Sequence, residues 1–170
     1  KTEAFMKKRF LAVLLLAVLL LPGCGKEKQT TFQVGDKVET YWFQFTVDQV
    51  KTTDRWMDYQ PQEGDRLAVC YLTMDSTFSE AVPMNWADFV LRWGDGEEDG
   101  TCPIEYQGQE QLPDEYDLVK GEERTGCLVF EVPQGVTRAK LVFQELFNEG
   151  DSDGVYTEGD TYYVDVDLPA

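Results

Sequence analysis

The chain of 170 residues contains 32 acidic and 15 basic residues, four cysteines and no histidine, and its formal net charge is −17. The absence of histidine removes the commonest general base and the commonest transition-metal ligand, so hydrolases that activate serine or cysteine with histidine are excluded. The excess of negative charge repels phosphate backbones, and we therefore expect no nucleic-acid partner.

The N-terminal segment has the pattern of a bacterial export signal that ends in a lipid-attachment site. Three basic residues at 7–9 precede an uninterrupted apolar run over residues 10–21. This run is shorter than the roughly 20 residues that a membrane-spanning helix needs. A short apolar run behind a positive segment is typical of a signal peptide. The sequence that follows, Leu21-Pro22-Gly23-Cys24, resembles the lipobox of bacterial lipoproteins.

The lipobox resemblance implies that a diacylglyceryl group is attached to the Cys24 thiol and that the chain is cut before this residue. Two acyl chains give stable anchoring, whereas a single chain binds membranes only reversibly. The predicted organisation is a signal peptide over residues 1–23, including residues 1–5 upstream of the expected start, then a lipidated tether over 24–31 and a domain over 32–170. Cleavage leaves 11 basic and 31 acidic residues, a formal charge of −20. We expect a domain held on the extracytoplasmic face of the cell membrane.

Beyond the tether, apolar and polar residues alternate with the period of two that is typical of β-strands. In chain order, strand patterns fall at residues 43–48, 66–74, 89–93, 102–106, 125–132, 140–147 and 162–168. Val50 breaks the phase of the first strand, as a β-bulge would, and only residues 79–88 could hold a helical turn. About seven short strands separated by Gly, Pro and Asp turns predict an all-β fold, an immunoglobulin-like antiparallel β-sandwich.

Several motifs in this order resemble a known family. Val34-Gly35-Asp36 leads into the first strand, Trp93-Gly94-Asp95-Gly96 ends the third, and residues 126–133 read Gly-Cys-Leu-Val-Phe-Glu-Val-Pro. This arrangement resembles the telokin-like, immunoglobulin-like domain of unknown function found on many lipoproteins of Gram-positive bacteria. The resemblance covers residues 32–168 and departs at Asp75-Ser76, where the family often has Asn. It implies a sandwich fold and a cell-surface location in a Gram-positive bacterium, and it carries over no catalytic residue.

Three cysteines remain besides the lipidated one, an odd number for an oxidising compartment. Cys70 is in phase with the core-facing residues of its strand, whereas Cys127 is out of phase with those of its own strand, and Cys102 follows an accessible loop. We therefore favour a Cys102–Cys127 disulfide, with Cys70 as a buried free thiol. A Cys70–Cys127 bond, which would mimic the inter-sheet bridge of immunoglobulin domains, stays the alternative. A catalytic thiol is not expected, because no histidine can activate one.

One acidic loop has the ligand spacing of a calcium site. Glu149, Asp151, Asp153 and Asp160 stand at positions 1, 3, 5 and 12 of an EF-hand-like pattern. The pattern departs from the motif at both its first and last positions, and predicted strands rather than helices flank it. Asp and Gly also collect in turns for conformational reasons. We therefore expect no cofactor and keep a calcium-stabilised structural domain as an alternative.

Aromatic residues in predicted loops are the candidates for ligand contact. Trp56 and Tyr59 lie between the first two strands, and Tyr116 lies in an acidic loop. Exposed aromatic side chains on a rigid scaffold suit binding, although each could instead fold back and cap an open end of the sandwich. Core or strand packing is expected for the remaining tryptophans, Trp42, Trp86 and Trp93.

The leading functional hypothesis is a non-enzymatic module at the cell surface. Such a module would bind an envelope protein, a peptide or a glycan, or would serve as an accessory domain to another protein. An enzyme acting outside the membrane is a second alternative, and it would require a deep pocket lined by convergent polar groups.

Overall fold

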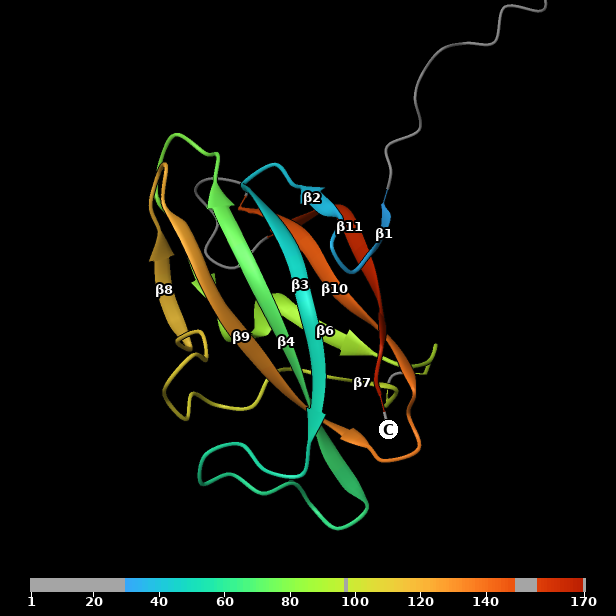
Figure 1. Cartoon of the computed structure of the whole chain (residues 1–170). Coiled ribbons are helices and arrows are strands. Elements are labelled where there is room, and N and C mark those ends of the chain that lie inside the picture. The colour runs from blue at the N-terminus through green and yellow to red at the C-terminus, as the bar shows by residue number, and fades with distance from the viewer. Residues whose placement is uncertain (1–29, 97, 149–155, 170) are drawn as a thin grey trace, which may run out of the picture.

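The computed structural model describes residues 30–96, 98–148 and 156–169, in which two β-sheets pack against each other (Figure 1). The strands in these ranges are β1 (Thr31–Gln33), β2 (Lys37–Glu39), β3 (Phe43–Thr53), β4 (Asp65–Ser76), β5 (Val82–Asn85), β6 (Phe89–Arg92), β7 (Gly100–Thr101), β8 (Glu115–Leu118), β9 (Glu123–Pro133), β10 (Arg138–Asn148) and β11 (Tyr156–Asp167). A short 3-10 helix, Trp86–Asp88, lies between β5 and β6. The predicted β-sandwich is confirmed.

A five-stranded sheet has the order β1-β11-β10-β6-β7, and a four-stranded sheet has the order β2-β3-β4-β9. A separate ribbon pairs β5 with β8. Neighbouring strands are antiparallel except that β1 runs parallel to β11. Strands β1, β2, β5 and β8 were not predicted, because each has at most two alternating apolar residues, whereas three alternating residues, Phe89, Leu91 and Trp93, predicted β6.

The strand predicted over residues 102–106 is wrong. The strand in this region is β7, which ends at Thr101, and the chain then continues as an irregular segment. This segment runs beside the edge strand β9, where the Ile104 N–H donates a hydrogen bond to the Val129 carbonyl at 2.7 Å. Partial burial of the Ile104 side chain against Val129 and its apolar neighbours accounts for the apolar residue within the predicted strand.

Alternate side chains of both sheets meet in the core between them. Four phenylalanines, Phe43, Phe45, Phe89 and Phe143, form its aromatic centre, with ring centroids 5.0–6.5 Å apart. Such tilted and edge-on ring contacts are favourable beyond the area that they bury. The register of β3 against β4 shifts between Val47 and Gln49, which confirms the bulge predicted from the phase break.

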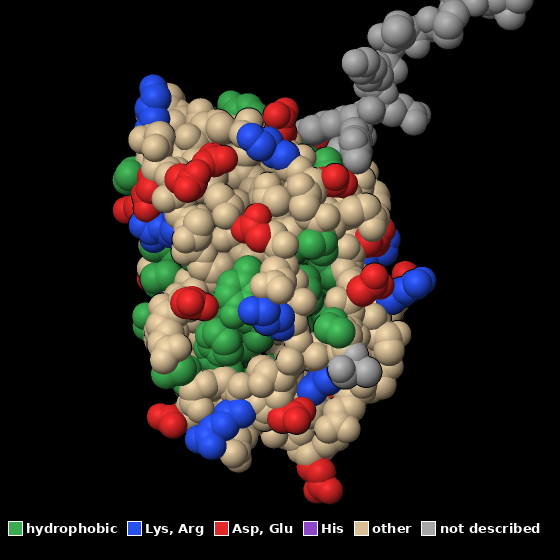
Figure 2. Space-filling view, in the orientation of Figure 1, with side chains coloured by type: hydrophobic (Ala, Val, Ile, Leu, Met, Phe, Trp, Pro, Cys, Tyr) green, Lys and Arg blue, Asp and Glu red, His purple; other side chains and the backbone are tan. Residues whose placement is uncertain are grey.

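A second apolar cluster, here called the outer cluster, lies on the outer face of the four-stranded sheet. Leu67, Val69, Cys127 and Val129 are buried there under partly buried Trp56, Tyr59, Tyr71 and Ile104. Figure 2 shows hydrophobic side chains gathered on one face of the molecule, in the orientation of Figure 1. Because both faces of β4 are covered, its residues 67–72 form a nearly continuous apolar run rather than an alternating one.

Arg66 ties the end of β11 to the four-stranded sheet. Its side chain is only 8% exposed, and its guanidinium donates hydrogen bonds to the carbonyls of Val136, Leu168 and Pro169 at 2.7, 3.2 and 2.7 Å. Hydrogen bonds from a charged donor to buried carbonyls are among the stronger polar contacts in proteins. Arg66 therefore fixes the C-terminal end of the strand whose outer face forms the groove described next.

Candidate functional site: a groove on the five-stranded sheet

The outer face of the five-stranded sheet carries a groove of about 860 Å³. This volume lies within the usual range of small-molecule sites, about 300–1,000 Å³. The groove is formed by outward-facing residues of β6, β10 and β11, by Gln33 of β1 and by the loop after β6. Its charged and aromatic lining includes Arg92, Trp93, Arg138, Lys140, Tyr163 and Asp165.

Strand register sets these side chains in rows across the sheet. Gln33 is paired with Asp165, Asp165 with Lys140, and Lys140 with Arg92. Directly opposed residues on neighbouring antiparallel strands have Cβ atoms about 4.5–5.5 Å apart. The row therefore places an amide, a carboxylate, an ammonium and a guanidinium side by side on one face.

The polar groups of the groove are linked by exposed contacts. Lys140 Nζ lies 3.2 Å from Asp165 Oδ1 and 5.8 Å from the ring centroid of Tyr163. Gln33 Nε2 donates to Asp165 Oδ2 at 3.0 Å. Arg138 Nε lies 3.5 Å from Asp167 Oδ1, and both of these side chains are almost fully exposed. Exposed ion pairs contribute about 0–1 kcal/mol, so a ligand can replace these partners at little cost.

The loop after β6 closes one end of the groove. Arg92 Nη2 donates to the Gly96 carbonyl at 2.9 Å, and the Gly96 N–H donates to Asp99 Oδ2 at 2.9 Å. A Cβ atom built on Gly94 would collide with the Asp99 side chain, so a larger residue at position 94 would require this carboxylate to move. Trp93 is half-buried, since it packs against the core while also lining the groove.

Trp56 and Tyr59, expected as exposed contact residues, lie on the opposite sheet and are half-buried in the outer cluster. The Trp56 N–H donates a hydrogen bond to the Tyr59 carbonyl at 3.1 Å, and the Tyr59 N–H donates one to the Trp56 carbonyl at 2.8 Å. The Tyr59 hydroxyl donates to the carboxylate of Glu131, and this hydrogen bond is the main reason that the Tyr59 pKa is raised to about 12. The expectation of exposure is wrong here, because the apolar outer face of β4 and β9 attracts these rings.

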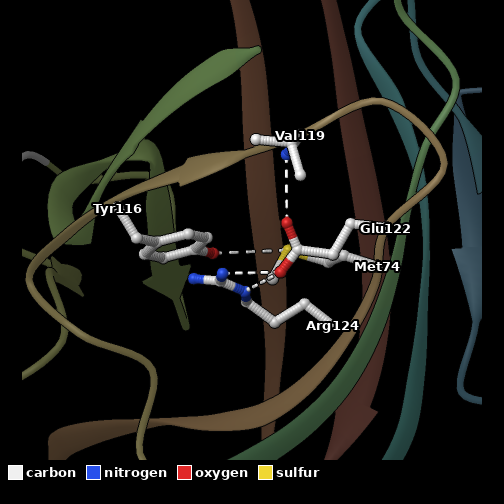
Figure 3. A network of polar contacts seen from close by, with 5 residues as sticks. All are labelled: Met74, Tyr116, Val119, Glu122 and Arg124. Atoms are coloured by element: carbon white, nitrogen blue, oxygen red, sulfur yellow. Dashed lines mark hydrogen bonds and ion pairs between the residues drawn. The ribbon is translucent and has the colours of Figure 1, made fainter.

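Tyr116 is also half-buried, on β8 at the edge of the sandwich (Figure 3). Its ring lies under the guanidinium of Arg124, 4.5 Å away, and its hydroxyl contacts the sulfur of Met74 at 3.6 Å. Glu122 holds Arg124 by a hydrogen bond of 2.8 Å from Nε and accepts the Val119 N–H at 3.1 Å. Burial raises the Tyr116 pKa. This network packs β8 onto the sandwich, so Tyr116 is not the exposed contact residue expected.

Among the other tryptophans, Trp42 and Trp93 pack against the core as expected, whereas Trp86 is 38% exposed at the start of the 3-10 helix. The expectation of core or strand packing is therefore wrong for Trp86. Trp86 is the first residue of this short helix, which is capped by Asn85 and has no buried residue.

The favoured Cys102–Cys127 disulfide is wrong, because Cys70, Cys102 and Cys127 are all free thiols. Cys127 is buried in the outer cluster, and its backbone pairs with residues 110–112 rather than with the segment at Cys102. The alternative Cys70–Cys127 bond is absent as well, since these two side chains lie on opposite faces of the four-stranded sheet. The expected burial of Cys70 is confirmed, and desolvation raises its pKa to about 12.

Other predicted site residues lie outside the described part of the chain. These are Cys24, Glu149, Asp151 and Asp153. The last calcium candidate, Asp160, is exposed on β11, and its backbone N–H donates to Glu145 Oε2 at 3.2 Å. Within residues 30–96, 98–148 and 156–169, no three or more Cys, Asp or Glu side chains gather as metal ligands. In the same ranges no helix is long and apolar enough to cross a membrane.

The groove was not predicted from the sequence. The available signal was the placement of Arg92 and Lys140 at outward positions of otherwise apolar strands, in a chain with few basic residues. Alternation alone marks such residues only as facing solvent, and their meeting on one face depends on the order of β6 and β10 in the sheet.

Comparisons with known proteins place this architecture in a family. The family described as "Domain of unknown function (DUF4352)" matches residues 32–152. The yjhA protein from Bacillus subtilis has a similar structure, with a TM-score of 0.60 and 18% identity over 81% of this chain and 99% of that chain. A "putative lipoprotein (ycdA)" from Bacillus subtilis subsp. subtilis str. 168 has a TM-score of 0.55 and 17% identity over 83% of this chain.

The chain spans only 39% of the length of the ycdA chain. The search among curated proteins finds no match. At identities below 20%, these structural likenesses establish the β-sandwich fold alone.

Proposed function

This chain belongs to the family described as "Domain of unknown function (DUF4352)", and we propose that it is a membrane-tethered, non-enzymatic module that binds glycans of the cell envelope. The observation that carries the proposal is the groove on the five-stranded sheet, with its rows of polar side chains beside aromatic rings.

The groove has the groups that sugar recognition needs. A sugar ring presents hydroxyl groups around its edge and C–H groups on its faces. Gln33, Gln144 and Asp165 offer amide and carboxylate groups for the hydroxyls, and the Tyr163 ring offers an apolar face with a polar edge. Because these residues stand on rigid strands, the site is preorganised, which reduces the entropy lost on binding.

Two of the three carboxylates in the groove are already paired with cations, which favours a binding role over glycoside hydrolysis. Hydrolysis requires two carboxyl groups that face each other across the bond to be cut. Asp165 and Asp167 lie side by side on β11, and each is paired with a cation of β10, namely Lys140 and Arg138. The proposal therefore assigns these acids to ligand orientation.

The signal-like N-terminus supports the proposed location at the outer face of the membrane. Lipid on Cys24 would leave six residues, 24–29, before the described domain. Such a segment spans at most about 20 Å when fully extended, so the domain would stay close to the membrane and to the innermost envelope polymers. The description of the structurally similar ycdA protein as a "putative lipoprotein" is consistent with this location.

Binding can be tested with the mature lipoprotein, purified in detergent, on an array of envelope polysaccharides and their oligosaccharides. We expect retention of at least one glycan, weakened about tenfold or more by Tyr163→Ala, since stacking on an aromatic ring is lost. The matched control is Tyr71→Ala, because this tyrosine also lies under a lysine but on the opposite sheet. Wild-type binding by Tyr163→Ala, or no retained glycan, would refute the proposal.

Anchoring has its own test. Mass spectrometry of the native protein should show an N-terminal diacylglyceryl cysteine at position 24. An intact N-terminus, or an unmodified thiol at that position, would overturn the proposed membrane tether without affecting the groove.

A further inference from the structure

The groove is much less negative than the strongly acidic domain to which it belongs. The described residues contain nine basic and 26 acidic side chains. Three of the nine cations, Arg92, Arg138 and Lys140, line the groove together with only three of the carboxylates, Asp95, Asp165 and Asp167. The groove is thus formally neutral, while the described residues as a whole carry a formal charge of −17. An anionic ligand is therefore repelled less in the groove than it would be if the negative charge were distributed evenly over the domain.

Two of the groove's cations stand directly opposite each other. Arg92 of β6 and Lys140 of β10 are cross-strand partners, and both line the groove. Like charges in this position destabilise a sheet. Lys140 is partly compensated by Asp165, whereas Arg92 forms no ion pair within the described ranges and donates to a loop carbonyl. An anionic group seated between the two side chains would relieve their repulsion and gain charge-assisted hydrogen bonds.

The surrounding residues limit the charge of the ligand. Asp95 and Asp165 line the same groove, and they would repel a polymer that carries a negative charge on every few atoms. Gln33 and Gln144 flank the cation pair with uncharged polar groups, and Tyr163 lies beneath Lys140. This combination fits one negative group set among hydroxyls and beside the face of a ring.

We propose that the groove selects acidic sugars, whose carboxylate binds between Lys140 and Arg92 while the sugar ring lies against Tyr163. This inference rests on the proposed glycan-binding function and adds to it a requirement for charge. Arg92 supplies a planar guanidinium suited to a carboxylate, and Lys140 supplies a mobile point charge.

The test uses calorimetric titration of the mature lipoprotein with an oligosaccharide that carries a single galacturonate and with its methyl ester, which is the same oligosaccharide without the charge. We expect the acid to bind about tenfold or more tightly than the ester, since hydrogen bonds to charged groups have about this effect. The advantage should shrink as salt is added, because exposed charges are screened.

Lys140→Gln tests the site itself. This side chain is 52% exposed, so the variant should fold, and an unchanged melting temperature would verify this. We expect it to lose about tenfold in affinity for the acid and little for the ester. The matched control is Lys51→Gln, which removes the same charge above Tyr71 on the opposite sheet and should bind like wild type.

The outcomes separate the two proposals. Equal binding of acid and ester that depends on Tyr163 would refute the charge requirement and leave glycan binding in the groove intact. Unaltered preference for the acid in Lys140→Gln, or an equal loss in Lys51→Gln, would also refute the inference. Binding of neither compound by a protein that retains other glycans on the array would overturn the inference alone.

Discussion

Glu145 offers a sharp test of the structure, because it is a carboxylate almost completely removed from solvent. It lies on β10 at a register shift between Gln144 and Leu146 and is 2% exposed. Its Oε1 accepts hydrogen bonds from the Tyr41 N–H at 2.6 Å and from the Tyr162 hydroxyl at 2.8 Å. Its Oε2 accepts the Asp160 N–H at 3.2 Å. The carboxylate thus joins β10, β11 and the turn before β3.

Glu145→Gln keeps the shape of the side chain but replaces one acceptor oxygen by an NH₂ group. In the less costly orientation of the glutamine, its NH₂ group points toward the Asp160 N–H, so that two donors face each other and this hydrogen bond is lost. The amide oxygen then still accepts the hydrogen bonds from the Tyr41 N–H and the Tyr162 hydroxyl, which are now bonds to a neutral group. Loss of one buried hydrogen bond costs about 1–3 kcal/mol, and each bond that changes from charged to neutral loses about 1 kcal/mol. We expect a total loss of about 3–5 kcal/mol in the free energy of unfolding.

The assay is urea denaturation at neutral pH, followed by tryptophan fluorescence. A loss of this size is a large part of the about 5–15 kcal/mol that stabilises a typical domain, and it lowers the melting temperature by about 6–20 °C. The matched control is Glu158→Gln on the neighbouring strand, an exposed position where the same substitution should change stability by less than about 0.5 kcal/mol. Equal stability of the two variants would show that the three contacts to Glu145 are not formed.

Four further results are expected. Thiol labelling of the native protein should modify half-buried Cys102 first. The free energy of unfolding should fall as pH rises from about 9 toward 12. In this range the Cys70 thiol loses its proton in the unfolded chain but keeps it in the folded protein, where its pKa is raised to about 12. Cys70→Ala should make the decrease of stability with pH less steep, and an unchanged pH dependence would contradict the raised pKa of Cys70 as its cause. Gly126→Ala should cost about 1–3 kcal/mol in urea denaturation, because its Cβ atom would lie 2.6 Å from Leu112 Cδ2, whereas Gly135→Ala, with open space around it, should be neutral. Millimolar calcium should shift the melting temperature by less than about 1 °C, and a larger rise would favour the calcium-stabilised alternative that uses the acidic residues between positions 149 and 160.

The assignment of residues to sheet faces could be made from the sequence with good accuracy. Alternation placed Cys70 in the core and Cys127 on the other face of its strand, and the structure confirms both positions. The phase break near Val50 similarly identified the bulge in β3. Both succeed because successive side chains of a strand point to opposite faces, which is a property of the local backbone.

Predictions about loop residues and about the disulfide failed because they depend on contacts that the local backbone does not determine. The expectation that Trp56 and Tyr59 are exposed did not anticipate that the outer face of β4 and β9 is apolar and can bury them. The Cys102–Cys127 pairing failed because phase along a strand gives no distance between two strands. Both errors concern contacts between residues far apart in the chain.

The sequence by itself therefore determined an all-β chain, the faces of its longer strands and the pattern of a lipoprotein signal, since each depends on residues close together in the chain. Only the tertiary structure decided that β6 pairs with β10 in a register that sets Arg92 against Lys140, and that their neighbours on β11 complete a groove. Strand order and register follow from how whole sheets cover each other's apolar faces, and that balance is not contained in any single segment.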